Sequence, residues 1–259
     1  LEISEAKVGP DDVGVAWTLQ DLGRCENDAG RLGEAEALFR RALEIFEAKL
    51  EPDDVQVAVN LFSFGQCAQE AGQPAEAEGL FRRALRIKEA KLGPDDVEVA
   101  STLSELGDCV RQAARPGDAE LLQRALRIEE TKLGPDDVKV TLTLHEMGRC
   151  VLEARWPGDA KALLRRALEI EEAKLGPDDV EVANTLYWLA RCVREAGRPG
   201  EAEPLFQRAL EIVEAKFGPD DVKVAEMRLG LGRCAKTPVD RRRWNSDVHP
   251  CFLCLVRRK

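Results

Sequence analysis

Cysteine and histidine are the residues of this 259-residue chain that could bind a metal ion or act in catalysis. The chain has eight cysteines but only two histidines, His145 and His249. Cys251 and Cys254 form a Cys-x-x-Cys pair near His249, but a structural zinc site needs four ligands at a recognisable spacing. His145 has no nucleophile that the sequence can place beside it. The cysteine and histidine pattern therefore predicts neither a metal site nor an enzyme.

Two further patterns resemble ligand motifs but lack the necessary context. The sequence from Gly230 to Ala235 is similar to a dinucleotide-binding loop, but it lies inside an expected helix with no strand before it. Six Asp-Asp pairs could suggest calcium, yet each lacks the backbone carbonyls and the ligand number of a calcium loop. Helix capping explains these pairs better, because a carboxylate accepts hydrogen bonds from the first-turn N–H groups. We expect no cofactor and no catalytic residue.

The composition excludes two further classes of function. With 44% hydrophobic residues, 33% charged residues and a net charge of −10, the chain is acidic and folded rather than disordered. A nucleic-acid-binding protein needs a basic face that displaces counterions. No stretch approaches the 18 or so consecutive apolar residues of a transmembrane helix. We therefore expect a cytoplasmic protein that binds neither nucleic acid nor a membrane.

One sequence unit recurs along the chain. The tetrapeptide Gly-Pro-Asp-Asp, with Glu replacing Gly in the second copy, begins at residues 9, 51, 93, 134, 176 and 218, which gives steps of 42, 42, 41, 42 and 42. The pattern Ala-Leu-x-Ile recurs in the same register at residues 42, 84, 125, 167 and 209. A period of this length is typical of repeat proteins, in which each unit packs on its neighbours.

Each repeat is predicted to form two helices. In the fifth repeat, apolar residues at helical spacing predict a first helix around Val182 to Val193 and a second around Ala202 to Ile212. Gly197 can adopt the left-handed conformation that ends the first helix, and Pro199 fits the first turn of the second. One helix pair cannot bury its apolar side chains alone, whereas stacked pairs share a continuous core. The predicted fold is an all-α solenoid of antiparallel helix pairs.

The residues that carry this pattern also indicate a family. Those matching in the fifth repeat are Leu186, Leu189, Ala190, Val193, Gly197, Ala202, Phe206 and Ala209. The chain resembles tetratricopeptide repeat proteins of the kinesin light chain and nephrocystin type, whose repeat has the same extended length, over about residues 1–236. This resemblance implies a right-handed superhelix whose first helices line a concave groove that binds peptides or proteins.

The repeat pattern divides the chain into three parts. Residues 1–12 are expected to be the end of a truncated preceding repeat, residues 13–236 the solenoid, and residues 237–259 a basic, disordered tail outside the pattern. The expected full repeats and the unpaired helix that follows them lie near 16–49, 58–91, 100–132, 141–174, 183–216 and 222–236. Because the first residue is Leu1 rather than Met, this start looks like a cut or processed end.

Three departures from the pattern predict weak points. The third repeat is one residue short between Gly117 and Gln123, so either the turn absorbs the deletion or the second helix packs less well. Ala114 and Arg155 replace the glycine that ends the first helix elsewhere. Arg228 occupies the position that Leu186 and Leu144 hold in earlier repeats, which predicts an imperfect last helix.

Six of the cysteines occupy a single repeat position. They are Cys25, Cys67, Cys109, Cys150, Cys192 and Cys234. Stacked equivalents lie about 10 Å apart in such an array, beyond the Cα separation of about 7 Å that a disulfide allows. We interpret them as small, buried packing residues in a reducing compartment.

The repeats differ from one another mainly on one face of the first helix. The residues of this face lie three and four positions apart, so they share one side of a helix. Packing surfaces need the same residue in every repeat, whereas a groove that binds an extended ligand needs a different residue at each step. Because aromatic residues and arginine are enriched among binding hot spots, we predict a peptide-binding groove on this face. Its residues are Trp17, Gln20, Arg24, Asn27, Phe62, Gln66, Gln69, Ser104, Asp108, Arg111, His145, Arg149, Leu152, Asn184, Tyr187, Arg191 and Arg194.

Sequence drift is the alternative explanation for this variable face. Three i,i+4 ion pairs could satisfy its arginines without any ligand, namely Arg24 with Asp28, Arg149 with Glu153 and Arg191 with Glu195. We favour groove binding, because drift on a solvated face rarely introduces Trp, Phe, Leu and Tyr.

The predicted function is therefore a non-enzymatic scaffold for protein–protein interaction. The arginines favour a protein or peptide partner with acidic residues, and kinesin light chain grooves likewise take acidic peptides with an aromatic anchor. Similar arrays leave open a cargo adaptor of the kinesin light chain kind and the recognition arm of a larger nucleotide-switch regulator. A structural solenoid that only self-associates through its open ends is the alternative from a different class.

Overall fold

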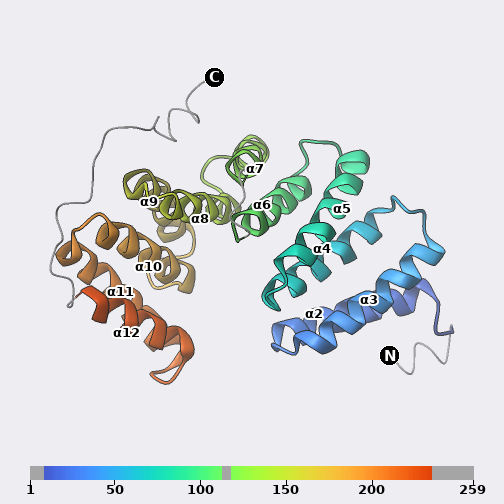
Figure 1. The fold of residues 1–259 in the computed structure, drawn as a ribbon, viewed down its shortest axis with the longest axis horizontal. Helices are drawn as coiled ribbons and strands as arrows, with labels where there is room; N and C mark the ends of the chain where they lie inside the picture. The colour runs from blue at the N-terminus through green and yellow to red at the C-terminus, as the bar shows by residue number, and fades with distance from the viewer. Residues whose placement is uncertain (1–8, 113–117, 235–259) are drawn as a thin grey trace. The chain divides into compact units, whose positions relative to one another are not determined.

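Eleven α-helices and no β-strand make up the part of the chain that the computed structural model describes, residues 9–112 and 118–234 (Figure 1). This confirms the all-α class. The helices are α2 (Val13–Asp28), α3 (Leu32–Lys49), α4 (Val55–Glu70), α5 (Pro74–Leu92), α6 (Val97–Gln112), α7 (Asp118–Lys132), α8 (Val138–Glu153), α9 (Pro157–Lys174), α10 (Val180–Glu195), α11 (Pro199–Phe217) and α12 (Val222–Cys234). The predicted terminal segments 1–8 and 235–259, with His249, Cys251 and Cys254, lie outside the described residues.

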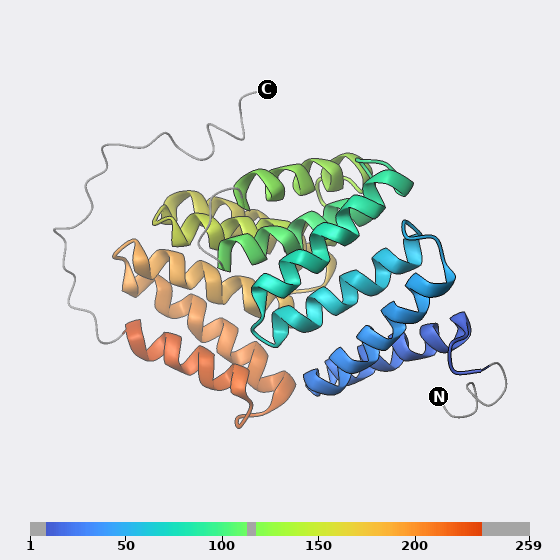
Figure 2. The same cartoon turned by 45° about the vertical axis from the view of Figure 1, so that its right-hand side comes forward.

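The chain forms two compact units, an N-terminal unit of residues 1–128 and a C-terminal unit of residues 129–259. In the N-terminal unit, α2 packs on α3 and α4 packs on α5, while α3 contacts α4 and α5 contacts α6. In the C-terminal unit, α8 packs on α9 and α10 packs on α11, while α9 contacts α10 and α11 contacts α12 (Figure 2). Sequential helices therefore form antiparallel pairs, as the repeat pattern predicts. The right-handed superhelical path stays a prediction.

The second aspartate of each Gly-Pro-Asp-Asp turn caps the helix that follows. Asp12 Oδ1 accepts a hydrogen bond from the backbone N–H of Gly14 at 2.8 Å, and Asp179 Oδ1 accepts one from Glu181 at 2.9 Å. The same bond recurs at Asp54, Asp96, Asp137 and Asp221. The carboxylate satisfies an N–H group that has no partner within the helix. These contacts confirm capping as the structural role of the Asp-Asp pairs.

Glycine on the first helix lets the two helices of one repeat approach closely. A Cβ atom added at Gly65 would lie 2.7 Å from Cε1 of Phe81, closer than real Cβ atoms come. Gly23 makes the same close approach to Phe39. Both rings are buried, so each fills the space that the absent side chain leaves. In these two repeats the contact fixes the packing of the helix pair and so the direction in which its first helix faces.

The short third repeat keeps its second helix in register. Leu122 and Ala125 are fully buried, and a Cβ atom at Gly107 would lie 2.8 Å from Leu122 Cγ. These positions correspond to Phe81 and Ala84 of the preceding repeat. Of the two sequence-based alternatives, the structure therefore supports absorption of the deletion before Leu122. Residues 113–117, including Ala114, lie outside the described residues.

Arg155 ends α8 in a left-handed conformation. Its φ angle is 67°, close to the values of 73°, 73° and 77° at Gly30, Gly72 and Gly197. The surrounding hydrogen bonds are also shared, because the Arg155 N–H donates to the Leu152 carbonyl at 2.9 Å as the equivalent glycines do. The structure therefore shows Arg155 in the left-handed conformation that glycine adopts elsewhere, and we expect this to cost a residue with a Cβ atom about 1–2 kcal/mol.

Replacing Arg155 with glycine should therefore stabilise the protein. We expect Arg155→Gly to raise the free energy of unfolding by about 1 kcal/mol, after allowance for the greater freedom of glycine in the unfolded chain. Urea denaturation followed by circular dichroism measures the difference. Arg198→Gly is a matched control, since Arg198 is exposed and has a φ angle of −120° that needs no glycine. A lower stability of Arg155→Gly would contradict the assignment of strain.

The last described helix departs from the repeat pattern as predicted. Arg228 is exposed, whereas Leu186 at the equivalent position of the fifth repeat is 1% exposed. The guanidinium group of Arg228 instead pairs with Glu214 at 2.5 Å and donates to the Pro219 carbonyl at 3.2 Å. Val222 and Leu229 of the same helix are also exposed. In α12, the leucine position that is buried in the fifth repeat therefore carries a paired, exposed arginine.

The six cysteines at the equivalent repeat position are buried, with one exception. Cys67, Cys109, Cys150, Cys192 and Cys234 are buried free thiols, as expected of packing residues, but Cys25 is exposed. The buried cysteines pack on the preceding second helix, as Cys67 does beside Ala35 and Phe39. No described helix precedes α2, so no residue of the described part of the chain covers Cys25 in this way, and the prediction of burial is wrong there. Burial raises the pKa of Cys109 and Cys192 to about 12, which keeps these thiols protonated.

Candidate functional site

The predicted groove residues lie on the first helices α2, α4, α6, α8 and α10, and we call them the first-helix surface. Their exposure divides them into three groups. Trp17, Arg24 and Asn184 are exposed. The half-buried members are Asn27, Phe62, Gln66, Gln69, Arg149, Tyr187, Arg191 and Arg194. The buried members are Gln20, Ser104, Asp108, Arg111, His145 and Leu152.

Burial corrects the sequence-based picture for this last group. Asp108 and Arg111 pair with one another inside the N-terminal unit, and His145 contacts Thr185 of the next first helix. These side chains and the other three buried members retain at most 9% exposure. They face neighbouring helices, so they offer a ligand little surface. The accessible part of the first-helix surface consists of the exposed and half-buried residues.

In the N-terminal unit, polar side chains of the first-helix surface bind the next first helix. Arg24 Nε donates to Ser63 Oγ at 3.3 Å, rather than to Asp28 as the sequence suggested. Gln66 Nε2 donates to Glu105 Oε1 at 2.9 Å. In the same way, Asn27 donates to Glu70 and Gln69 to Asp108. These hydrogen bonds join residues about one repeat apart, so they brace consecutive first helices.

The C-terminal unit carries a different arrangement, an aromatic and arginine cluster. The guanidinium carbon of Arg149 on α8 lies 5.0 Å from the ring centroid of Trp188 on α10, and that of Arg191 lies 4.4 Å from it. Tyr187 packs edge-to-face on Trp188 and on Phe206, at 5.6 Å in each case. Such contacts attract a cation to the face of the ring. We call Arg149, Tyr187, Trp188 and Arg191 the arginine–tryptophan cluster.

Carboxylates border this cluster. Arg149 Nη1 donates to Glu146 Oε1 at 2.8 Å. The predicted pair of Arg191 with Glu195 is present but long, at 3.8 Å. The arginine side chains are 25% and 31% exposed, respectively. A ligand can therefore reach both guanidinium groups, but it has to compete with nearby acidic side chains.

Sequence reasoning missed Trp188. The equivalent positions of earlier repeats hold Ser63, Glu105 and Glu146. Trp188 follows the predicted groove residue Tyr187 directly in the sequence. The signal that could have found it is the same change of residue type from repeat to repeat that selected the other columns. Trp188 matters because its ring holds the arginine side chains of two consecutive first helices.

Phe62 and Tyr187 are only partly available. The ring of Phe62 packs edge-to-face on Phe81 at 5.6 Å, and the ammonium group of Lys88 lies 4.4 Å from its centroid. Tyr187 packs on Phe206 in a similar manner. One part of each ring therefore packs on the core of its unit, and another part stays accessible. Trp17 differs from them, because 52% of its surface is exposed.

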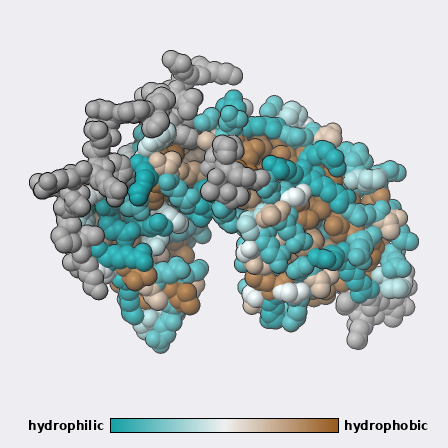
Figure 3. Space-filling view, in the orientation of Figure 1, coloured by the Kyte–Doolittle hydropathy of each residue, from teal (hydrophilic) through white to brown (hydrophobic). Residues whose placement is uncertain are grey.

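Hydrophilic side chains alternate with apolar patches on the face seen in Figure 3. The large apolar side chains that are exposed in residues 9–112 and 118–234 are Trp17, Leu92, Leu142, Leu175, Phe217, Val222 and Leu229. Trp17 on α2 and Leu142 on α8 occupy equivalent positions near the start of the first helix of their repeats. No helix in this part of the chain is long and apolar enough to cross a membrane.

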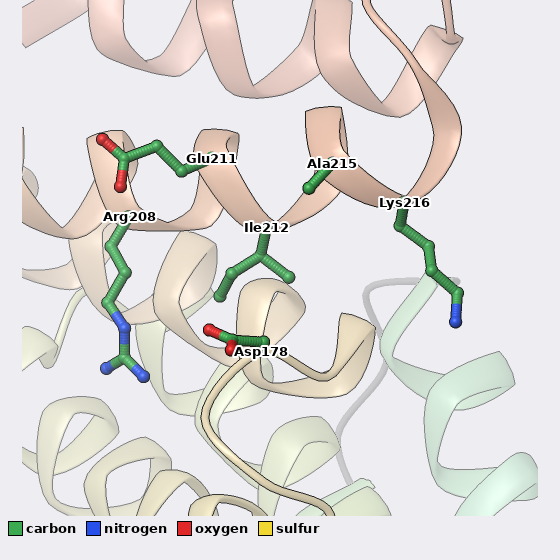
Figure 4. A pocket seen from close by; sticks show the side chains of 6 residues that line it. All are labelled: Asp178, Arg208, Glu211, Ile212, Ala215 and Lys216. Carbon is green, nitrogen blue, oxygen red and sulfur yellow. The ribbon is translucent and has the colours of Figure 1, made fainter.

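A hollow of about 500 Å³ lies between α11 and the turn before α10 (Figure 4). Arg208, Glu211 and Lys216 of α11 and Asp178 of the turn are its polar lining, and Ile212 and Ala215 form its apolar side. One repeat earlier, the equivalent residues line a hollow of about 330 Å³. In both, an arginine clamps the turn, as Arg208 does by donating to Glu172 at 2.6 Å and to the Pro177 carbonyl at 3.0 Å. Recurrence at equivalent positions indicates that these hollows are produced by repeat packing.

Residues 9–112 and 118–234 contain no candidate metal site. No group of three or more His, Cys, Asp or Glu side chains in this region could hold a metal ion. The two acidic residues with the largest upward pKa shifts, Glu129 and Glu171, owe these shifts to burial between helices. They belong to the packing of the repeats rather than to the accessible surface.

Comparison with known proteins defines the class of protein. The family described as tetratricopeptide repeat matches residues 1–48, 25–90, 57–122, 157–215 and 181–237. Since these matches span most of the sequence, the chain belongs to the tetratricopeptide repeat family. No curated protein matches it.

Solved structures share this fold at low sequence identity. A kinesin light chain-like protein of Podospora anserina with nearly identical repeats is 19% identical, with a TM-score of 0.64 over 80% of this chain and 98% of that one. BtubC (BKLC) of P. vanneervenii is 21% identical, with a TM-score of 0.66 over 80% and 82%. A Rap protein complexed with competence and sporulation factor is 14% identical, with a TM-score of 0.71 over 85% and 62%. The kinesin light chain-like resemblance is therefore confirmed at the level of fold.

Proposed function

We propose that this chain is a non-enzymatic scaffold that binds a peptide or protein segment through the accessible part of its first-helix surface. The arginine–tryptophan cluster is the observation that carries the proposal. It combines three residue types that dominate binding hot spots, and its arginines are partly exposed on consecutive first helices. The family typically mediates protein–protein interaction, which agrees with this role.

The chemistry of the cluster favours an acidic partner with an aromatic residue. A carboxylate can accept two parallel hydrogen bonds from one guanidinium group, and Arg191 has only a long contact to Glu195 at 3.8 Å to compete with it. The half-buried rings of Tyr187 and Trp188 can pack on an aromatic side chain. A cargo-adaptor role of the kinesin light chain kind is consistent with such a partner, as is the recognition arm of a larger nucleotide-switch regulator.

Charge reversal at the cluster should weaken partner binding strongly. We expect the double variant Arg149→Glu with Arg191→Glu to weaken the binding of a captured partner at least about 30-fold, and Tyr187→Ala to weaken it about 10-fold or more. The partner is captured from a lysate with the wild-type chain, and its Kd is then measured with purified components by fluorescence anisotropy. Arg165→Glu with Lys174→Glu is the matched control, because these exposed α9 residues produce the same charge change away from the cluster.

An unchanged Kd in both cluster variants would contradict the proposal. The alternative of a self-associating solenoid makes a different prediction, since its sedimentation coefficient would rise with concentration and would not respond to the cluster variants. Folding of each variant is checked by circular dichroism, so that loss of binding is not confused with loss of structure.

A further inference from the structure

A buried polar cluster connects the fourth and fifth repeats inside the C-terminal unit. Glu171 of α9 is 1% exposed, His145 of α8 is 5% exposed and Thr185 of α10 is fully buried. Three helices therefore each contribute one polar side chain to the same buried contact. Phe46 and Val213 occupy the position of Glu171 in other repeats, which indicates that the fold itself does not require a polar group there.

Thr185 is the centre of the hydrogen bonds in this cluster. Its Oγ1 lies 2.6 Å from Glu171 Oε2 and 3.1 Å from the Glu181 carbonyl oxygen, and it is also within hydrogen-bond distance of His145 Nε2. The hydroxyl has one hydrogen, so it can donate fully to only one of these partners. When it donates to the Glu181 carbonyl or to His145, the link to Glu171 needs a proton on the carboxyl group. The other carboxyl oxygen, Glu171 Oε1, lies 3.3 Å from His145 Nε2.

We propose that Glu171 and His145 share one buried proton that holds α10 against the α8–α9 hairpin, so that the contact loosens when this proton is lost. A negative carboxylate is costly at a position that is only 1% exposed. The neutral, protonated pair avoids this cost and lets the carboxyl group donate to Thr185. Above neutral pH the contact must either open or bury an uncompensated charge.

Burial and nearby charges shift the pKa values of Glu171 and His145 in opposite directions. Burial is the main reason why the pKa of Glu171 is raised to about 7, and Glu181 and Asp179 of the α10 end raise it further, whereas hydrogen bonds with Thr185 and Thr141 lower it. Burial lowers the pKa of His145 to about 4, with an added contribution from Arg149. The pair therefore keeps one proton between about pH 4 and pH 7.

The sign of the pH effect follows from these shifts. The carboxyl group of Glu171 holds its proton more tightly when folded than its ordinary value of 4.5 implies. Its stabilising contribution is therefore complete below pH 4.5 and is lost as the pH rises through about 7. Because the pKa of Glu129 is also raised to about 7 by burial, the wild type alone cannot isolate Glu171, and a matched variant is needed.

Native-state hydrogen exchange of the full chain tests this inference. The exchange rates of α10 amides are compared between wild type and Glu171→Gln at the same pH, so that the intrinsic rates cancel. We expect the ratio of wild-type to variant rate to rise about tenfold per pH unit from pH 5 to pH 7 and then to level off. Glu169→Gln is the control, since Glu169 is exposed on the same helix, and it should follow the wild type at every pH. A pH-independent ratio for Glu171→Gln would overturn the proposal.

A second measurement keeps the proposal testable if Glu171→Gln does not fold. The chain contains two histidines, so the ring signals of His145 can be assigned by NMR with a His249→Ala variant. The ring of His145 should remain neutral down to about pH 4, and titration near pH 6.5 in the folded wild type would overturn the shared-proton arrangement. Neither experiment uses a binding partner, so both are independent of the proposed function. Only one consequence rests on that function: because α8 and α10 carry Arg149 and Arg191, alkaline pH should also weaken partner binding.

Discussion

Phe81→Ala should lower the free energy of unfolding by about 3–5 kcal/mol, the largest effect that we expect from a single truncation in this chain. Phe81 is fully buried. Its ring fills the space above Gly65, where an added Cβ would lie only 2.7 Å away, and it packs edge-to-face on Phe62 at 5.6 Å. The loss combines the transfer of the ring to water with a cavity between α4 and α5 that the rigid helix pair cannot close.

Urea denaturation followed by far-ultraviolet circular dichroism measures this loss. Leu92→Ala is a suitable control, because Leu92 ends the same helix and is 39% exposed. We expect the control to lose less than about 1 kcal/mol, since little of its surface leaves water on folding. If the two variants lost similar amounts of stability, the contact between Gly65 and Phe81 would not be the centre of the second repeat.

Lys88→Met should have the opposite sign and stabilise the protein by about 1–3 kcal/mol. Lys88 is 1% exposed, and its ammonium group donates to Glu98 Oε2 and Thr102 Oγ1, both at 3.1 Å. Glu98 is 61% exposed, so water weakens its attraction for the ammonium group while Lys88 bears the full cost of burial. A methionine of similar length keeps the packing on Phe62 and removes the charge.

The pH dependence of Lys88→Met distinguishes charge burial from better packing. Burial lowers the pKa of Lys88 from its ordinary value of 10.5, while Glu98 and Asp96 raise it by a smaller amount. Folding therefore disfavours the charged form, and this cost disappears as the pH approaches 10.5. The advantage of methionine should shrink over the same range, as measured by urea midpoints. An advantage that stayed constant with pH would attribute the gain to packing.

Lys91→Met serves as the control for this variant. Lys91 is exposed and belongs to the same helix, where it pairs with Asp53 at 2.7 Å. Removing this exposed pair should change stability little, because water screens it. A comparable gain at both positions would mean that extra hydrophobicity, and not relief of a buried charge, is responsible.

How much of the structure the sequence predicts depends on how far apart along the chain the interacting residues lie. Helices, caps and turns follow from residues within one repeat, so the spacing of apolar residues and the Asp-Asp pairs were sufficient to predict them. The left-handed conformation of Arg155 is equally local, because Arg155 replaces the glycine that ends the first helix in other repeats, and this position has a positive φ angle. The same holds for the pair of Arg191 with Glu195, whose members lie one helical turn apart.

The candidate site could be predicted only in part. The face of the first helices follows from periodicity, and Arg149, Tyr187 and Arg191 of the C-terminal unit were selected in this way, although Trp188 was not. Which of them remain accessible depends on side chains about 40 residues away. Arg24 donates to Ser63 rather than to Asp28, and His145 is buried under Thr185 of the next first helix. No local pattern reports such contacts between consecutive repeats.

The sequence alone therefore determined that this chain is an array of capped helix pairs with one variable face, because each repeat encodes its own secondary structure. Only the tertiary structure decided which variable residues meet solvent, why Cys25 differs from the other cysteines of its column, and that Trp188 gathers two arginines. Burial and stacking are properties of neighbouring repeats, and the same residue type is exposed or enclosed according to what packs beside it.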